Sequence, residues 1–152
     1  MPKFDTSHKV KHSADRMYAL VADIERYPEF VPLCQALHIR GRKCVGDDEI
    51  IVADMTVAYK MIRESFTSKV TMRPSTREIL VEYLDGPFKH LENRWTFTPV
   101  EEEGNACRVR FYIDYEFRNR VLAGLMGAVF DKAFNKFSVA FEQRADAVYG
   151  SA

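Results

Sequence analysis

Residues 119–149 read NRVLAGLMGAVFDKAFNKFSVAFEQRADAVY, a stretch without proline in which apolar residues recur every three or four positions. This spacing is the period of a helix with one continuous apolar face. Polar residues such as Asp131, Lys132 and Gln143 occupy the opposite face. At 1.5 Å per residue, the predicted helix is about 45 Å long. A helix of that length needs a wide apolar partner surface, which the rest of the chain must supply.

The beginning of this helix differs from the remainder, because residues 121–130 read VLAGLMGAVF and carry no charge. Gly124 and Gly127 interrupt this segment, and each lowers the helix propensity by about 1 kcal/mol relative to alanine. We therefore expect this end of the helix to be the looser one. Two interpretations stay open. The segment is either a helix start packed under a loop, or a movable lid or surface that touches lipid.

Between Cys34 and Phe117 the period of the apolar residues changes from about four to two. Residues 62–73 and 107–117 alternate strictly between apolar and polar side chains, a pattern typical of strands with one face toward water. Turn-forming residues separate the successive strands, for example at 73–76 and 85–87. Six strands joined by short turns are expected to form an antiparallel meander.

Residues 3–11 predict one further strand, and a helix is expected to follow it with Ser13 as its cap. The prolines of residues 27–32 limit helix continuation and predict a short turn or helical kink. The expected fold class is therefore α+β: a curved antiparallel sheet of about seven strands wrapped around a long C-terminal helix, with two short helices after the first strand. At 152 residues, we expect residues 1–152 to form a single domain.

The charge balance and the cysteines restrict the environment and partners of the chain. Its 22 basic and 22 acidic residues give no global argument for nucleic acid, so no DNA partner is expected. Cys34, Cys44 and Cys107 are odd in number and far apart, which favours reduced thiols in a cytoplasmic compartment. The N-terminal residues MPKFDTSHKV lack the apolar core of a signal peptide, and no run of apolar residues is long enough to span a membrane.

No catalytic or metal-binding constellation stands out in the sequence. His8 and His12 are four residues apart but straddle a predicted strand end, and that spacing makes a metal face only on a helix. The acidic runs 47–49 and 101–103 lie in predicted turns, where a solvated surface is the simpler interpretation. We therefore expect no catalytic residues, no metal and no catalytic cofactor.

The predicted inward positions of the sheet mix large side chains with small or polar ones. Phe66, Trp95 and Phe111 are large, whereas Ser68 and Asn93 are small or polar. An apolar pocket with few polar groups is the usual form of a small-molecule site. Alternatively, the small residues face the aromatic residues of the helix and fill the core. Glu64 is also in the inward phase, and it needs a charged partner, a raised pKa or a place in water at a strand end.

Two segments resemble a known family. Residues 21–34, VADIERYPEFVPLC, and residues 86–97, GPFKHLENRWTF, are similar to the coenzyme-Q-binding proteins of the START-like, helix-grip superfamily, which also includes polyketide cyclases and the bacterial ribosome-association toxin. The family fold agrees with the meander and long helix predicted above.

The resemblance implies non-catalytic binding of ubiquinone or a related polyprenyl lipid in an apolar groove under the C-terminal helix, in support of respiratory electron transport. It also implies a cytoplasmic protein that can lie peripherally at the inner membrane. Ser68, Asn93 and Arg94 are the candidate hydrogen-bond donors to a quinone head group. Together with the inward positions and the helix start, the resemblance predicts that the groove is lined by Phe30, Val31, Pro32, Phe66, Ser68, Pro87, Phe88, Asn93, Trp95, Phe111, Leu125, Met126, Val129 and Phe130.

Two other hypotheses follow from the same superfamily. The toxin branch implies an interaction module that acts on ribosomal subunits, with Arg40, Arg42, Lys43, Arg118 and Arg120 as candidates for contacting RNA phosphates. The cyclase branch implies a cyclase or dehydratase, which needs an acid–base pair inside the groove. Its candidates are Glu64 with Tyr83 or Tyr115.

Overall fold

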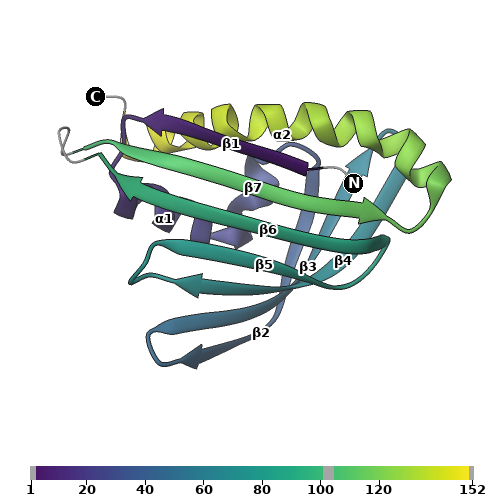
Figure 1. Cartoon of the computed structure of the whole chain (residues 1–152), viewed down its shortest axis with the longest axis horizontal. Coiled ribbons are helices and arrows are strands. Elements are labelled where there is room, and N and C mark those ends of the chain that lie inside the picture. The colour runs from purple at the N-terminus through teal and green to yellow at the C-terminus, as the bar shows by residue number, and fades with distance from the viewer. Residues whose placement is uncertain (1–2, 101–104, 151–152) are drawn as a thin grey trace.

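One seven-stranded antiparallel sheet and a long helix make up most of the computed structural model, which describes residues 3–100 and 105–150 (Figure 1). The strand order in the sheet is β1-β7-β6-β5-β4-β3-β2. The elements are β1 (Lys3–Val10), α1 (Ala14–Ala22), the 3₁₀ helix η1 (Ile24–Glu29), β2 (Cys34–Val45), β3 (Asp48–Tyr59), β4 (Ile62–Arg73), β5 (Glu78–Asp85), β6 (Phe88–Pro99), β7 (Cys107–Phe117) and α2 (Arg120–Tyr149).

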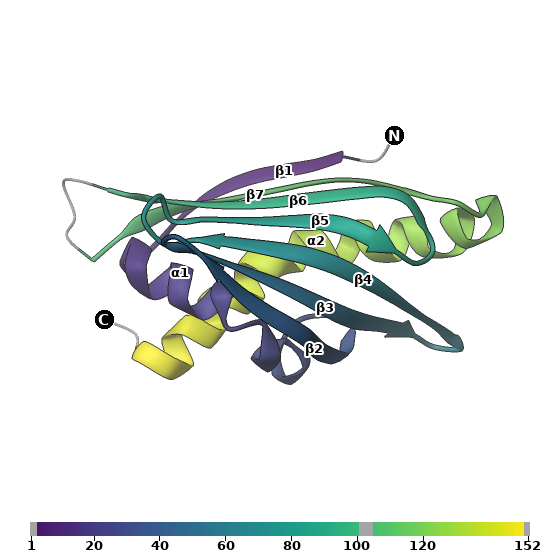
Figure 2. The same cartoon turned by 90° about the horizontal axis from the view of Figure 1, so that it is seen from below.

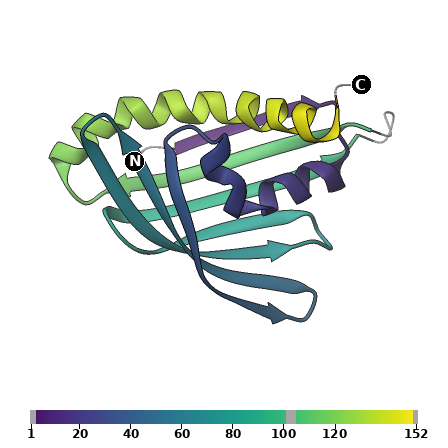
Figure 3. The ribbon, with the colours of Figure 1, turned by 180° about the vertical axis from the view of Figure 1, so that it is seen from behind.

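The sheet curves around α2, which lies along its concave side (Figures 2 and 3). Helices α1 and η1 lie on the same side of the sheet, toward the C-terminal half of α2. From β2 to β7 each strand pairs with the next one in the chain, and β1 completes the sheet by pairing with β7. The predicted α+β fold with a meander, a long C-terminal helix and two short helices after the first strand is confirmed.

Local side chains explain where the helices begin and end. The Ser13 hydroxyl accepts a hydrogen bond from the backbone N–H of Arg16 at 3.2 Å, which caps α1 as predicted. The Asn119 side chain accepts the N–H groups of Val121 and Leu122 at 2.7 and 3.3 Å, so it caps α2. The predicted kink at residues 27–32 begins earlier, because residues 24–29 form η1 with Pro28 inside it.

A β-bulge interrupts the pairing of β4 with β5. Thr67 pairs with Asp85 and Ser68 pairs with Tyr83, so Leu84 of β5 is the extra residue. In β4 itself, Val70, Thr71 and Met72 are all buried, so the alternation predicted for residues 62–73 is not strict. Bulges bend a strand and increase its twist, which contributes to the curvature that lets the sheet wrap around α2.

Helix α2 is anchored mainly through its C-terminal two thirds. Phe130, Phe134 and Phe137 pack against Phe111 and Tyr115 of β7, with ring centroids 5.5 to 5.8 Å apart. Near its C-terminal end, the Asp146 carboxylate lies 2.7 Å from Nε2 of the buried His12, and the Tyr149 hydroxyl donates to the Arg16 carbonyl at 3.1 Å.

The first turns of α2 are much less enclosed. Val121 is 70% exposed and Leu125 is 57% exposed, whereas Met126 is buried. A side chain at Gly124 or Gly127 would meet no atom within 4 Å. The uncharged segment 121–130 is therefore buried on one face only, and its other face leaves apolar side chains in the open.

Candidate functional site

A cavity of about 130 Å³ lies between the concave face of the sheet and α2. The sheet contributes inward-facing residues from β2 to β7, α2 contributes residues from Phe130 onward, and η1 and the segment after it line one side. Pro32, Leu33 and Leu37 line the cavity but are only half-buried, so the cavity reaches the surface on this side.

Nine of the predicted site residues line this cavity, and five do not. The nine are Val31, Pro32, Phe66, Ser68, Phe88, Asn93, Trp95, Phe111 and Phe130. Phe30 instead packs against Phe141, with ring centroids 5.1 Å apart, and the Arg144 guanidinium lies 5.0 Å from its ring centre. Pro87 lies in the turn before β6, and Leu125, Met126 and Val129 precede the part of α2 that reaches the cavity. Whether the nine contact a ligand stays a prediction.

Several lining residues were not among the predicted site residues. Phe134, Phe137 and Phe141 belong to the apolar stripe of the helix, which marked them as core residues without separating core from cavity. Ala53 and Ala133 lie on opposite walls and are small enough to leave space between them. Their small side chains can be recognised in the sequence. That these two alanines face the same cavity is known only from the positions of β3 and α2 in the structure.

Ser68 is the clearest polar group in the cavity wall. Its side chain is 5% exposed and lines the cavity. A serine hydroxyl in this position can donate to, or accept from, a ligand in the cavity.

Asn93 offers a second polar group, two strands away. Its side-chain nitrogen donates to the Tyr112 carbonyl oxygen at 2.8 Å, which leaves the second N–H and the amide oxygen of Asn93. Ser68 pairs with Tyr83 and Asn93 pairs with Val81, so β5 separates them. At a strand spacing of nearly 5 Å and a rise of about 3.3 Å per residue, their backbones are about 10 Å apart across the sheet and about 7 Å apart along it.

Arg94 does not belong to the site. It follows Asn93 in β6, so its side chain lies on the opposite face of the sheet, where its guanidinium donates to the Glu92 carboxylate at 3.2 Å. The prediction of Arg94 as a head-group donor is wrong because successive residues of a strand point to opposite faces.

The cavity wall is electrically neutral. Among the residues that the structure describes, no acidic or basic side chain lines the cavity. Burial raises the pKa of the Cys34 thiol to about 11, and burial also raises the pKa of Tyr27, whose hydroxyl donates to the Val21 carbonyl. Both groups are therefore protonated at neutral pH, so the wall is matched to a neutral, mainly apolar molecule.

The predicted acid–base candidates do not meet in the cavity. Glu64 is half-buried on β4 opposite Val57, near the β3–β4 turn, and does not line the cavity. The Tyr83 hydroxyl accepts the backbone N–H of Phe88 at 3.2 Å. Tyr115 lies outside the lining, and burial raises the pKa of its hydroxyl to about 12. These three residues therefore give no acid–base pair around a ligand.

The segment Gly86-Pro87-Phe88 seals one end of the cavity. Gly86 has φ of +142°, and a Cβ there would lie 2.6 Å from the Cβ of Phe66, so only glycine lets this turn rest on β4. The chain then directs Phe88 inward, where it is 1% exposed and contacts the rings of Phe66 and Phe117 at 5.3 and 4.8 Å. Phe88 is thus an inner wall residue rather than a cover at a hairpin tip.

The predicted basic patch for RNA does not form. Arg40 is paired with Asp54 at 2.7 Å, and Arg42 is paired with Glu25 at 2.6 Å. The β2–β3 turn, near which Arg42 and Lys43 lie, and the β7–α2 junction, which holds Arg118 and Arg120, are at opposite ends of the molecule (Figures 1 and 2). These residues cannot contact one short stretch of phosphates together.

A curved antiparallel sheet that grips a long C-terminal helix over a neutral cavity defines a START-like protein of the helix-grip class. The chain belongs to the family described as polyketide cyclase/dehydrase and lipid transport, whose model matches residues 10–142. The family includes cyclases as well as proteins of other kinds, so membership alone does not decide between catalysis and binding.

Two relatives come from different branches. The ribosome association toxin RatA of Escherichia coli (strain K12) is 34% identical over 154 residues, covering 99% of this chain and 91% of the relative. The coenzyme Q-binding protein COQ10 homolog B, mitochondrial, of Xenopus laevis is 27% identical over 150 residues, covering 97% of this chain and 59% of the relative. The predicted resemblance to this superfamily is confirmed.

Solved structures agree with the fold. The 18 kDa protein CC1736 from Caulobacter crescentus has a TM-score of 0.81 and 32% identity, covering 99% of this chain and 100% of that chain. A START superfamily protein from Mycobacterium smegmatis has a TM-score of 0.79 at 19% identity, covering 96% and 98%. The second similarity shows the fold alone.

Proposed function

We propose that the protein binds ubiquinone or a related neutral polyprenyl lipid in the cavity under α2, without catalysis, in support of respiratory electron transport. The observation that carries the proposal is the neutral, almost wholly apolar wall, to which Ser68 and Asn93 contribute polar side chains. The similarity to a coenzyme Q-binding protein over 97% of this chain supports the same ligand class.

The size of the cavity limits which part of the ligand it holds. The cavity of about 130 Å³ is smaller than the pockets that hold drug-sized ligands, which measure about 300–1,000 Å³. The enclosed space therefore accepts a ring or about one isoprene unit. A longer tail requires that the first turns of α2 move outward, or that the tail lies outside the cavity. The exposure of Val121 and Leu125 makes the first turns the part of α2 that gives up the fewest contacts in such a movement.

The polar groups suit a ring with oxygen atoms on opposite sides. Ser68 donates to one carbonyl oxygen, and the second N–H of Asn93, about two strand spacings away, donates to the other. The apolar remainder supplies most of the binding free energy, since each buried CH₂ group contributes about 0.8 kcal/mol.

The test uses Trp95, which is the only tryptophan of the chain and lines the cavity. Titration with a short-chain ubiquinone is expected to quench Trp95 fluorescence with saturation. Protein purified from lipid-replete cells is expected to release an isoprenoid quinone into an organic extract, detected by mass spectrometry. Absence of both signals would overturn the proposal.

A second candidate function is association with ribosomal subunits. The observation that favours it is the 34% identity to a ribosome association toxin over 99% of this chain. The net charge of zero and the separated basic residues oppose binding through RNA phosphates alone. Salt-sensitive co-sedimentation with ribosomal subunits, together with no quinone binding, would favour this function over the first.

A further inference from the structure

Large apolar side chains are exposed mainly at one end of the molecule. Among residues 3–100 and 105–150, eight such side chains are exposed, and five of them come from three segments: Tyr59 and Met61 at the β3–β4 turn, Leu84 at the end of β5, and Val121 and Leu125 in α2. Met61 is 97% exposed. Figures 2 and 3 both show these three segments at the end where α2 begins.

Direct contacts hold two of these segments together. The Arg118 backbone N–H donates to the Pro87 carbonyl at 2.9 Å, which joins the β7–α2 junction to the β5–β6 turn. The Arg118 side chain donates to the Phe88 carbonyl at 2.8 Å. The β3–β4 turn lies at the same end of the molecule (Figures 2 and 3). We call this surface the α2-start end and define it by residues 59–64, 84–90 and 116–125.

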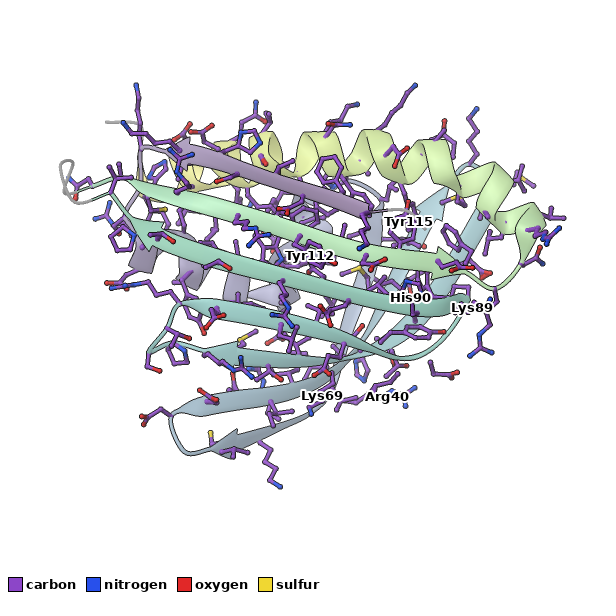
Figure 4. The ribbon with its side chains drawn as sticks, in the orientation of Figure 1. Arg40, Lys69, Lys89, His90, Tyr112 and Tyr115 are labelled. Carbon is purple, nitrogen blue, oxygen red and sulfur yellow. The ribbon has the colours of Figure 1, made fainter. Side chains whose placement is uncertain are left out.

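The α2-start end also carries a surplus of positive charge. Five basic residues, Lys60, Arg63, Lys89, Arg118 and Arg120, stand against three acidic residues, Glu64, Asp85 and Glu116, which leaves a net charge of +2 on a chain whose total is zero. Lys89 lies 3.7 Å from Glu116 at this end (Figure 4). Lys60 and Arg120 are next to the exposed Met61 and Val121 in the chain.

We propose that the α2-start end docks peripherally on an anionic lipid bilayer, with Met61, Val121 and Leu125 inserted among the head groups and the basic residues facing the lipid phosphates. Exposed apolar patches on monomers commonly mark interaction sites. Lys and Arg residues near an anionic leaflet add attraction that salt weakens. The inference goes beyond the proposed function, because docking depends on this surface and not on the ligand in the cavity.

A bilayer fits this end better than RNA does. An RNA contact would use many cations, and its affinity would depend steeply on salt, whereas here the surplus is two charges and Met61, Val121 and Leu125 are exposed. A bilayer accepts protruding side chains of any shape, so side chains from three separate segments can insert without a matching partner surface.

The experiment measures sedimentation of the whole chain with sucrose-loaded vesicles of phosphatidylcholine, with and without phosphatidylglycerol. The test variant combines Met61→Ser with Leu125→Ser. The matched control combines Val45→Ser with Val148→Ser, two exposed residues that are 49% and 53% accessible and come from the β2–β3 hairpin and the last turn of α2, at the other end of the molecule. A charge variant combines Lys60→Glu with Arg120→Glu.

We expect binding to the anionic vesicles that falls about tenfold in the test variant, stays unchanged in the control, and falls in the charge variant only with phosphatidylglycerol present. Thermal unfolding checks that all variants are folded. No sedimentation with anionic vesicles, an equal loss in the control, or sedimentation with ribosomal subunits instead would overturn the inference. Vesicle binding without quinone quenching of Trp95 would support the inference and count against the proposed function. Quinone quenching without vesicle binding would support the proposed function and count against the inference.

Discussion

Replacing Ala53 with leucine tests whether the space between the sheet and α2 is available to a ligand. Ala53 lies on the concave face of β3, is 5% exposed, pairs with Ser68 of β4 and lines the cavity. The larger side chain adds three carbon atoms at this position, directed into the cavity. Filling the space and displacing a ligand are therefore two effects of one substitution.

The expected change in stability follows from the cavity volume. An empty cavity of 130 Å³ costs about 3 kcal/mol at roughly 24 cal/mol per Å³. Three added carbons recover about 2.4 kcal/mol at 0.8 kcal/mol each, less about 0.5–1 kcal/mol for the leucine side-chain entropy. We expect Ala53→Leu to raise the free energy of unfolding by about 1–2 kcal/mol. In a filled core, the same change would lower it by about 1–3 kcal/mol.

The measurement is urea unfolding followed by Trp95 fluorescence, together with quinone titration of the folded protein. The variant is expected to be more stable and to lose most of the quenching. Ala58→Leu is the matched control, because Ala58 lies on the same strand five residues away, faces the other side of the sheet and does not line the cavity. Destabilisation of Ala53→Leu by more than about 1 kcal/mol, or undiminished quinone binding, would refute the reasoning.

Three further substitutions probe single polar groups. Ser68→Ala is expected to leave stability unchanged or raise it by about 1 kcal/mol, while the quinone Kd from Trp95 quenching rises about tenfold; an unchanged Kd would show that the hydroxyl does not contact the ligand. Tyr115→Phe removes a buried hydroxyl without a described partner, so urea unfolding should show about 1 kcal/mol more stability. Because burial raises the pKa of Tyr115 from 10.0 to about 12, the unfolded chain ionises first, and the wild type should lose stability above pH 10 more steeply than this variant; parallel curves would contradict this. Hydrogen bonds from Thr67 and Arg40 hold the pKa of Asp54 below its ordinary value of 3.8. The ionised Asp54 therefore stabilises the folded state at pH values above 3.8, and this stabilisation is lost as the pH falls through the pKa of the folded state. Acid unfolding curves of Asp54→Asn should therefore be flatter than those of the wild type, and curves of equal slope would exclude this contribution.

Much of the fold could be read from local patterns. The helical spacing of residues 119–149 predicted α2, and the alternation between Cys34 and Phe117 predicted the meander. These patterns succeed because the periods of 3.6 and 2 are properties of the backbone itself. The turn at residues 85–87 was also predicted from its local sequence. That Phe88 seals one end of the cavity depends on its contact with Phe66 of β4.

Part of the candidate site could also be predicted. Ser68, Asn93 and Trp95 were placed on the concave side by strand alternation, and they line the cavity. Leu125, Met126 and Val129 were expected to line the cavity as well, but they do not. The apolar stripe of the helix does not show which part of its length faces the cavity. The distance between two walls is a property of neither sequence segment alone.

The amino-acid sequence by itself determined the elements, their order and the apolar character of the space between sheet and helix. Only the tertiary structure decided that this space stays partly unfilled, because the separation of α2 from the sheet is set by the packing of Phe130, Phe134 and Phe137 on β7 and by the contact between His12 and Asp146. It also brought Met61, Leu84 and Leu125 to one end of the molecule. These residues are far apart in the chain, and the antiparallel arrangement of the strands with α2 places them at the same end.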